Sequence, residues 1–237
     1  MVAVDFTERL AWKGDEFVLD GVRFCAKGKY EPGALNGADG FLLYKSRHLI
    51  EEFGRFWLTR PGFKANNVFE LGVWEGGGTV FWFEWLQPDK HVAVDALERE
   101  DSPHFRRYVD ERGLNDRIRT YWGIDQADSE KLLQIAALEF SGPLDLVIDD
   151  ASHELERTRA SFDTLFPLLR PGALYVIEDW NWGLVPAFAQ DPANTWAATR
   201  TAPTSMVVEL VEQVGGSDRG DIACMTVFRN FVVIEKR

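Results

Sequence analysis

The sequence predicts an α/β protein built on a doubly wound, mostly parallel sheet. Apolar runs alternate with segments of helical spacing about every 20–30 residues, which is typical of such a sheet. Residues 68–79 give a second indication, because an apolar run ends at Glu70-Leu71-Gly72 and a glycine cluster then leads into the next apolar run. This pattern predicts a strand, a tight turn and a helix N-terminus. We therefore expect 67–71 to be the central first strand, with a nucleotide-like ligand over its carboxyl end.

The other elements are predicted in chain order from periodicity and turn residues. The predicted strands cover 67–71, 91–95, 117–122, 144–150 and 173–178. The predicted helices cover 41–58, 80–86, 103–112, 129–140, 155–169 and 205–214. The third of these helices has the clearest limits, because Ser102 suits its N-cap, Pro103 its first position and Gly113 its exit. Two β-branched runs at 225–228 and 231–234 predict a final hairpin.

No linker or internal repeat divides the chain, so we expect one domain over 1–237. Residues 1–60 are predicted to be an extension made of a loop and a helix, since 1–40 is irregular and its end is rich in glycine and turn formers. Residues 61–237 form the predicted Rossmann-like core. Within it, 180–204 is rich in Pro, Ala and Trp and is expected to be a substrate loop over the site.

Composition narrows the class of protein. The 237 residues are 46% hydrophobic, which suffices for a large core, and 26 basic against 38 acidic residues give a net charge of −12. Without a run of Lys or Arg, no nucleic-acid partner is expected. Apolar stretches stay shorter than the ~18–20 residues of a membrane span. The two cysteines, Cys25 and Cys224, form no motif. We expect a cytoplasmic protein and leave open whether it is a homo-oligomer.

The glycine turn has the pattern Glu70-x-Gly72-x-x-x-Gly76, which is neither a dinucleotide fingerprint nor a phosphate loop. A second acid, Asp95, closes the next apolar run, where a carboxylate can accept from both hydroxyls of a ribose. The alternative is a plain glycine-rich turn with a solvated Asp. Together the two motifs resemble those of class I S-adenosylmethionine-dependent methyltransferases. That resemblance implies their fold, with an antiparallel last strand at the sheet edge.

Two predicted neighbouring strands end in paired acids, Asp149-Asp150 and Glu178-Asp179. Strands pair at ~4.8 Å, so these carboxylates would crowd one rim of the sheet and repel one another unless a cation neutralises them. Oxygen ligands without cysteine favour Mg²⁺, with Mn²⁺ as a substitute. Alternatively, one acid of each pair only caps a helix or turn.

His153 follows three residues after the first acid pair, in the loop that leaves the strand. A histidine with an ordinary pKa of about 6.5 can take a proton at physiological pH. Its place beside the expected metal and methyl donor favours a general base, although a lone histidine after a strand is usually structural.

The run Asp149-Asp150-Ala151-Ser152-His153, followed by Glu178-Asp179-Trp180, resembles the metal-dependent sugar O-methyltransferases of natural-product pathways. These enzymes act on macrolide deoxysugars, rhamnosyl groups and mycobacterial methylmannose precursors, and the cephalosporin hydroxylase family looks related. The resemblance covers roughly 40–180. It implies three metal ligands, Asp150, Glu178 and Asp179, with His153 as the base. The predicted cofactor-binding residues are Glu70, Gly72, Gly76, Asp95, Asp125, Gln126 and Asp149.

The function implied is transfer of a methyl group from S-adenosylmethionine to a hydroxyl of a sugar or glycoside. One alternative is methylation of a phenol or catechol, although the catechol enzymes carry an Asp-Asn pair that is missing here. The other is a silent cofactor-binding protein. Aromatic and basic side chains around the site also have two interpretations. Tyr44, Lys45 and Arg47 either reach the cofactor carboxylate or lie on a solvated helix face, and Trp180, Trp182 and Trp196 either stack on a sugar or pack in the core.

Overall fold

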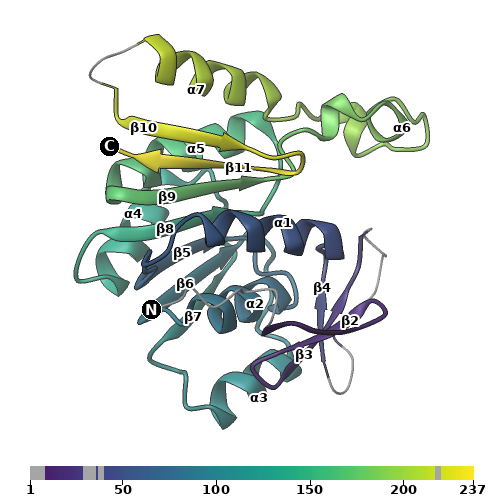
Figure 1. Ribbon diagram of the computed structural model, residues 1–237, viewed down its shortest axis with the longest axis vertical. Coiled ribbons are helices and arrows are strands. Elements are labelled where there is room, and N and C mark those ends of the chain that lie inside the picture. The colour runs from purple at the N-terminus through teal and green to yellow at the C-terminus, as the bar shows by residue number, and fades with distance from the viewer. Residues whose placement is uncertain (1–8, 29–35, 37–39, 217–219) are drawn as a thin grey trace.

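The computed structural model describes residues 9–28, 36, 40–216 and 220–237. In this part of the chain a seven-stranded sheet has the order β10-β11-β9-β8-β5-β6-β7 (Figure 1). The strands are β5 Asn67–Leu71, β6 Lys90–Asp95, β7 Ile118–Trp122, β8 Leu144–Asp149, β9 Leu169–Glu178, β10 Ile222–Val227 and β11 Phe231–Lys236. Strands β5 to β9 are parallel, and β11 is antiparallel to both of its neighbours. The predicted α/β fold and mostly parallel sheet are confirmed.

The strand order reverses at β5. The chain moves outward from β5 to β6 and β7, then returns to place β8 on the other side of β5. In open α/β sheets, ligands bind outside the carboxyl ends of the strands at such a reversal. The loops after β5 and β8 are therefore the ones that the topology brings to a binding crevice.

Helices cover both faces of the sheet, as Figure 1 shows. One face carries α1 Arg47–Leu58, α2 Gly77–Leu86 and α3 Pro103–Glu111, and the other carries α4 Ser129–Glu139, α5 Leu155–Leu165 and α7 Thr204–Gly216. Successive residues of the strands alternate between the two cores: Val68 packs in the first and Phe69 in the second. Parallel strands buried on both faces are expected to be mostly apolar, and β5 and β8 are so apart from Asn67, Glu70, Asp145 and Asp149.

The N-terminal segment is more ordered than the sequence predicts. Three short strands, β1 Ala11–Lys13, β2 Glu16–Leu19 and β3 Val22–Ala26, pair with β4 Phe41–Leu43 in a separate four-stranded sheet. The expected irregular structure is thus wrong for 11–26, whereas most of 29–39 lies outside the described residues. A signal was present, because Asp20-Gly21 is a typical hairpin turn and both residues have positive φ.

Two element boundaries and the position of one strand also differ from the prediction. The expected helix over 41–58 is a strand, β4, followed by α1 with Ser46 as its N-cap. The strand expected to start at residue 173 starts at Leu169 as β9, where a register irregularity against β8 absorbs Gly172. The last strand, β11, is antiparallel as predicted but lies inside the sheet, because β10 occupies the edge. Hydrophobic runs alone do not distinguish a central strand from an edge strand.

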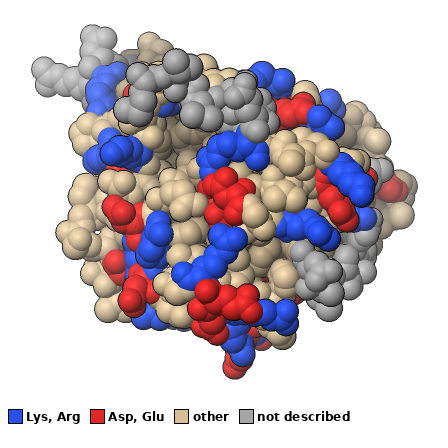
Figure 2. All heavy atoms as spheres, turned by 60° about the horizontal axis from the view of Figure 1, so that its bottom comes forward, with Lys and Arg blue, Asp and Glu red and all other residues tan. Residues whose placement is uncertain are grey.

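Residues 180–204 form a loop with short helical turns, η3 Trp182–Leu184, α6 Pro186–Ala189 and η4 Ala197–Thr199. Trp182, Ala197 and Ala202 form a small core of their own in this loop. On the face shown in Figure 2, the basic and acidic side chains of the described residues are interspersed. Among the described helices, none is long and apolar enough to cross a membrane.

Candidate active site

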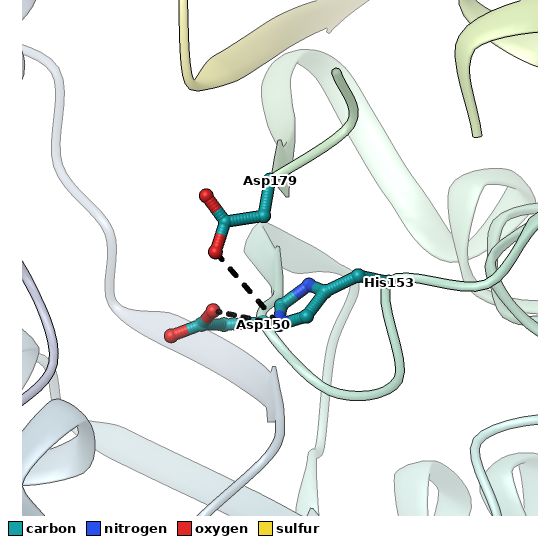
Figure 3. A group of neighbouring side chains, drawn as sticks. All are labelled: Asp150, His153 and Asp179. Atoms are coloured by element: carbon teal, nitrogen blue, oxygen red, sulfur yellow. Dashed lines mark ion pairs between the residues drawn. The ribbon is translucent and has the colours of Figure 1, made fainter. Parts of the chain in front are cut away.

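The acidic residues predicted at the ends of two strands do come together. Asp150 directly follows β8, Glu178 is the last residue of β9, and Asp179 comes next. We call these three residues the acidic rim. Figure 3 shows Asp150 and Asp179 turned toward His153, which the loop after β8 brings between them. The rim forms because β8 and β9 are parallel neighbours, so their carboxyl ends meet at one edge.

Two acids of the rim and the histidine lie within reach of a single ion. His153 Nε2 is 3.8 Å from Asp150 Oδ1 and 3.9 Å from Asp179 Oδ2. One ligand atom from each of the three residues lies within 4.8 Å of the other two. The carboxylate oxygens, without a thiolate, suit Mg²⁺ or Mn²⁺, whereas an imidazole nitrogen is more typical of Zn²⁺, Cu²⁺ or Ni²⁺ sites.

Buried atoms at the rim support this fit. Glu178 Oε1 is buried and has no hydrogen-bond partner among the described residues, and the same holds for His153 Nδ1. A buried carboxylate oxygen without a partner costs free energy unless a ligand satisfies it. The residues present therefore fit a hard divalent cation. The predicted roles of Asp150, Glu178 and Asp179 as its ligands remain predictions.

A lysine that the sequence left between two interpretations lies beneath the rim. Lys45 follows β4, is almost fully buried, and extends its ammonium group to two acids. Its Nζ is 2.5 Å from Glu178 Oε2 and 2.8 Å from Asp150 Oδ2. Burial lowers the pKa of Lys45, but the two carboxylates outweigh it and hold that pKa above its ordinary value. Burial, and next the Asp150 carboxylate, raise the pKa of Glu178, whereas Lys45 opposes the rise. Lys45 therefore does not lie on a solvated helix face.

The loop that carries His153 is fixed from two sides. Its backbone has φ of 53° at His153, a left-handed conformation that is uncommon outside glycine. Trp182 Nε1 donates to the carbonyl of His153 at 2.7 Å, and the N–H of Ser152 donates to Gln126 Oε1 at 2.8 Å. These bonds hold the imidazole over the rim. The tryptophan thereby connects the loop after β9 to the candidate base.

Asp149 and Gln126, predicted to bind the cofactor, are bonded to each other inside the protein. Gln126 Nε2 lies 3.1 Å from Asp149 Oδ1, and the Ser161 hydroxyl donates to Asp149 Oδ2 at 2.6 Å. Tyr175 completes this group of four, which we call the inner network. Burial raises the pKa of Asp149 to about 6, although the bonds from Ser161 and its neighbours oppose the rise. Contact of Asp149 or Gln126 with a cofactor stays a prediction.

The glycine turn has the backbone that its sequence predicts. Gly72 has φ of 99°, and a Cβ there would lie 2.3 Å from the carbonyl oxygen of Asp150. At Gly76, with φ of 85°, a Cβ would meet the ring of Phe105. At both positions the neighbouring protein atoms leave no room for a side chain, so glycine is required. The close approach at Gly72 places the glycine turn against the backbone of Asp150 in the acidic rim. Their predicted contact with the cofactor is not tested by this packing.

The acids near the turn are also engaged. Asp95 Oδ2 accepts from the N–H groups of Val73 and Trp74 at 2.9 and 2.8 Å, so the carboxylate shapes the turn itself. Glu70 is buried, with Oε2 3.0 Å from His91 Nε2 on the neighbouring strand. Their predicted roles toward the cofactor remain predictions. A carboxylate has about four lone-pair sites, so Asp95 keeps capacity for a ribose hydroxyl.

A cavity of about 380 Å³ lies beyond the carboxyl ends of β6 and β7. Its lining comes from the end of β7, from the loops after β6 and β7 and from α4: Glu98, Arg99, Glu100, Trp122, Gly123, Ile124 and Lys131. Asp125, the remaining predicted cofactor residue, follows this lining directly, forms an ion pair with Arg157 and accepts from the N–H of Ala127 at 2.9 Å. Its contact with the cofactor remains a prediction.

Comparison with known proteins agrees with this geometry. A family described as "Methyltransferase domain" matches residues 69–180, which begin in β5 and end just after the acidic rim. Residues 69–180 therefore resemble a methyltransferase domain. The match includes the glycine turn, Asp95, His153 and the three acids of the rim.

Sequence relatives extend beyond the methyltransferase domain. The mycinamicin VI 2''-O-methyltransferase of Micromonospora griseorubida is 33% identical over an alignment of 252 residues, gaps included. The alignment covers 95% of this chain and 57% of the relative. An 8-demethyl-8-alpha-L-rhamnosyl tetracenomycin-C 2'-O-methyltransferase of Streptomyces olivaceus is 47% identical over 132 residues, covering 53% of this chain and 31% of that protein. The predicted resemblance to sugar O-methyltransferases is confirmed.

A solved structure shows the same fold. The MycE methyltransferase of the mycinamycin biosynthetic pathway, in complex with Mg, SAH and mycinamycin VI, is 31% identical with a TM-score of 0.57. The match covers 83% of this chain and 50% of that one. The chain thus spans about half the length of the curated relatives and of this structure. The predicted class I methyltransferase fold is confirmed.

Lys45, Ser161, Tyr175 and Trp182 are the site residues whose roles the sequence did not assign. Ser161 lies twelve residues after Asp149, at a spacing that carries no local sign of contact. Lys45 lies 105 residues before Asp150. Only the assembled sheet brings these partners together.

Proposed function

We propose that this protein transfers a methyl group from S-adenosylmethionine to a hydroxyl of a sugar or glycoside with the help of Mg²⁺. The observation that carries the proposal is the meeting of Asp150, Asp179 and His153 next to the glycine turn of a methyltransferase domain. The names of the relatives, which refer to rhamnosyl and mycinamicin substrates, support a sugar acceptor.

The rim residues have distinct roles in this proposal. Asp150, Asp179 and the unpartnered oxygen of Glu178 would hold Mg²⁺, which when bound lowers the pKa of a coordinated hydroxyl. His153 Nε2 takes the proton of the acceptor hydroxyl as a general base. The carboxylates of Asp150 and Asp179, 3.8 and 3.9 Å away, stabilise the imidazolium that results. Trp182 orients the base through its bond to the His153 carbonyl.

The donor is proposed to lie over the glycine turn. Asp95 is assigned to the ribose, and the cavity beyond β6 and β7 lies on the side where the adenine is expected. The remaining predicted contacts keep their assignments: Glu70, Gly72, Gly76, Asp125, Gln126 and Asp149. Of the tryptophans in 180–204, Trp182 and Trp196 pack on each other with ring centroids 5.0 Å apart. This mutual packing favours a framework for the substrate loop over direct stacking on the sugar.

The test combines binding and turnover. Calorimetry should show binding of S-adenosylmethionine and its demethylated product but not of NAD, and Asp95→Ala should weaken that binding by roughly 1.5–3 kcal/mol. Methyl transfer should occur to rhamnosyl glycosides and not to catechol, should stop on exhaustive chelation, and should return with Mg²⁺ or Mn²⁺. Full activity after chelation would remove the metal from the proposal, and preference for catechol would replace the acceptor. The cytoplasmic location and the oligomeric state stay predictions.

A further inference from the structure

Lys45 contacts two of the three acids of the acidic rim. It comes from the segment between β4 and α1, outside the residues that match the methyltransferase family. Its ammonium group contacts Asp150, which follows β8, and Glu178, which ends β9. Lys45 and Glu178 are both 2% exposed, so this contact is sealed from solvent.

The lysine uses only one oxygen of each acid. It binds Asp150 through Oδ2 and Glu178 through Oε2. The other oxygens remain available, since Asp150 Oδ1 faces His153 and Glu178 Oε1 is buried without a partner. Lys45 thus fixes the orientation of each carboxylate from below and leaves one oxygen of each directed elsewhere. A ligand shell that is set before the ion arrives has less conformational freedom to lose on binding.

The lysine also sets the charge of the site. With its carboxylates ionised, the rim carries three negative charges, and the ammonium of Lys45 reduces the formal total to minus two. One divalent cation neutralises that total. Without the lysine, and with all three carboxylates still ionised, the formal total would be minus three, which matches a trivalent ion instead.

We propose that Lys45 is a positioning residue that orients Asp150 and Glu178 and makes the rim selective for divalent over trivalent cations. The inference rests on the metal site of the proposed function and adds a determinant of metal selectivity to it. A lysine that only tethers the N-terminal segment to the core would change stability when removed, but would not change the relative affinity for ions of different charge.

The test measures the ratio of Tb³⁺ to Mn²⁺ affinity, by terbium luminescence and Mn²⁺ electron paramagnetic resonance on the full chain at one pH. Both affinities are measured at the same pH and ionic strength, so effects of a substitution that act equally on the two ions cancel in the ratio. In Lys45→Met, loss of one nearby positive charge favours the trivalent ion more than the divalent one. We expect the ratio to rise by about tenfold or more over the wild type.

Matched variants separate charge from folding. Glu178→Gln and the double variant Lys45→Met/Glu178→Gln differ only in the lysine, and the double variant restores the formal total of minus two. The ratio of Tb³⁺ to Mn²⁺ affinity in the double variant should exceed the ratio in Glu178→Gln by about tenfold or more. It should thereby return toward the wild-type value. This pair decides the question even if Lys45→Met alone does not fold. Lys90→Met, which removes a lysine from an ion pair with Glu139 near the start of β6, should leave the ratio unchanged.

The outcomes distinguish this inference from the proposed function. A ratio that stays at the wild-type value in Lys45→Met, or that is equal in the two Glu178→Gln backgrounds, would overturn the role of Lys45 alone. Failure of the wild-type protein to bind Mn²⁺ at all would overturn the metal-dependent function, and this inference with it.

Discussion

Asp149 and Asp150 are neighbours in the chain, yet their carboxylates lie in opposite surroundings. Asp149 points into the inner network, is 2% exposed, and is bonded by Gln126, Ser161 and Tyr175. Asp150 leaves the end of the strand, keeps 29% of its side chain exposed, and faces Lys45 and His153. Successive side chains of a strand point to opposite faces, so adjacent acids diverge. Two identical residues at one strand end thus lie in different environments: Asp149 in a buried hydrogen-bond network, and Asp150 in a partly exposed group of charged side chains.

The largest expected effect comes from the matched pair Asp150→Asn and Asp149→Asn. Asp150→Asn removes a charge that serves Lys45, His153 and the proposed metal, so we expect kcat/KM for methyl transfer to fall by roughly 10⁴-fold or more. Asp149→Asn keeps the size of the side chain and one of its two acceptor oxygens, and it lies away from the proposed metal, so its loss should be much smaller. Steady-state kinetics and Mn²⁺ titration check this. Equal losses of kcat/KM in the two variants would show that Asp149 matters as much to methyl transfer as Asp150.

Replacing His153 separates the base from the metal. His153→Ala should lower turnover by ~10²–10⁴, the usual contribution of a positioned general base. Mn²⁺ affinity and binding of the cofactor product should remain, because the carboxylates of the rim are intact. Loss of metal affinity would show that His153 is a ligand. Near-normal turnover would mean that it is a structural residue of the loop.

The elevated pKa of Asp149 should appear in the pH dependence of stability. The folded-state pKa of Asp149, about 6, lies above the ordinary value of 3.8, so the folded protein holds this proton more strongly than the unfolded chain. The free energy of unfolding of the wild type should therefore fall as pH rises between about 4 and 6, by about 3 kcal/mol from this group. Asp149→Asn has no carboxyl group at this position, so its free energy of unfolding should not show this fall.

Urea unfolding of both proteins from pH 4 to 7, with chelator present, provides the measurement. The difference in unfolding free energy, Asp149→Asn minus wild type, should rise with pH across that interval. A difference that is constant with pH would mean that Asp149 has no elevated pKa in the folded protein.

The smallest expected effect concerns a partner of the inner network. Ser161→Ala removes the hydroxyl that donates to Asp149 at 2.6 Å, so the free energy of unfolding should fall by about 1–3 kcal/mol. Turnover and affinity for the cofactor product should change little, since Ser161 has no contact with the acidic rim in the described structure. A large loss of turnover at unchanged stability would show that the network acts on the chemistry.

Several features of the protein are determined by the sequence itself. The strand at 67–71, the helix after Ser102 and the final hairpin follow from local periodicity and turn residues, and the structure has each of them. Parallel strands bring their carboxyl ends to one edge, so the meeting of Asp150, Asp179 and His153 was also predictable. Asp20-Gly21 is also a hairpin signal in the sequence, although the composition of 1–40 predicts irregular structure there.

Tertiary structure alone decided the rest. Lys45 reaches partners 105 and 133 residues away, and no local pattern of residues specifies such a contact. The sequence placed Asp149 near the cofactor, but its carboxylate is bonded to side chains from α5, β9 and the loop after β7. Likewise, β11 lies inside the sheet because β10 covers its edge. Periodicity reports which face of an element is apolar, whereas the partner of a buried charge depends on how distant elements pack around it.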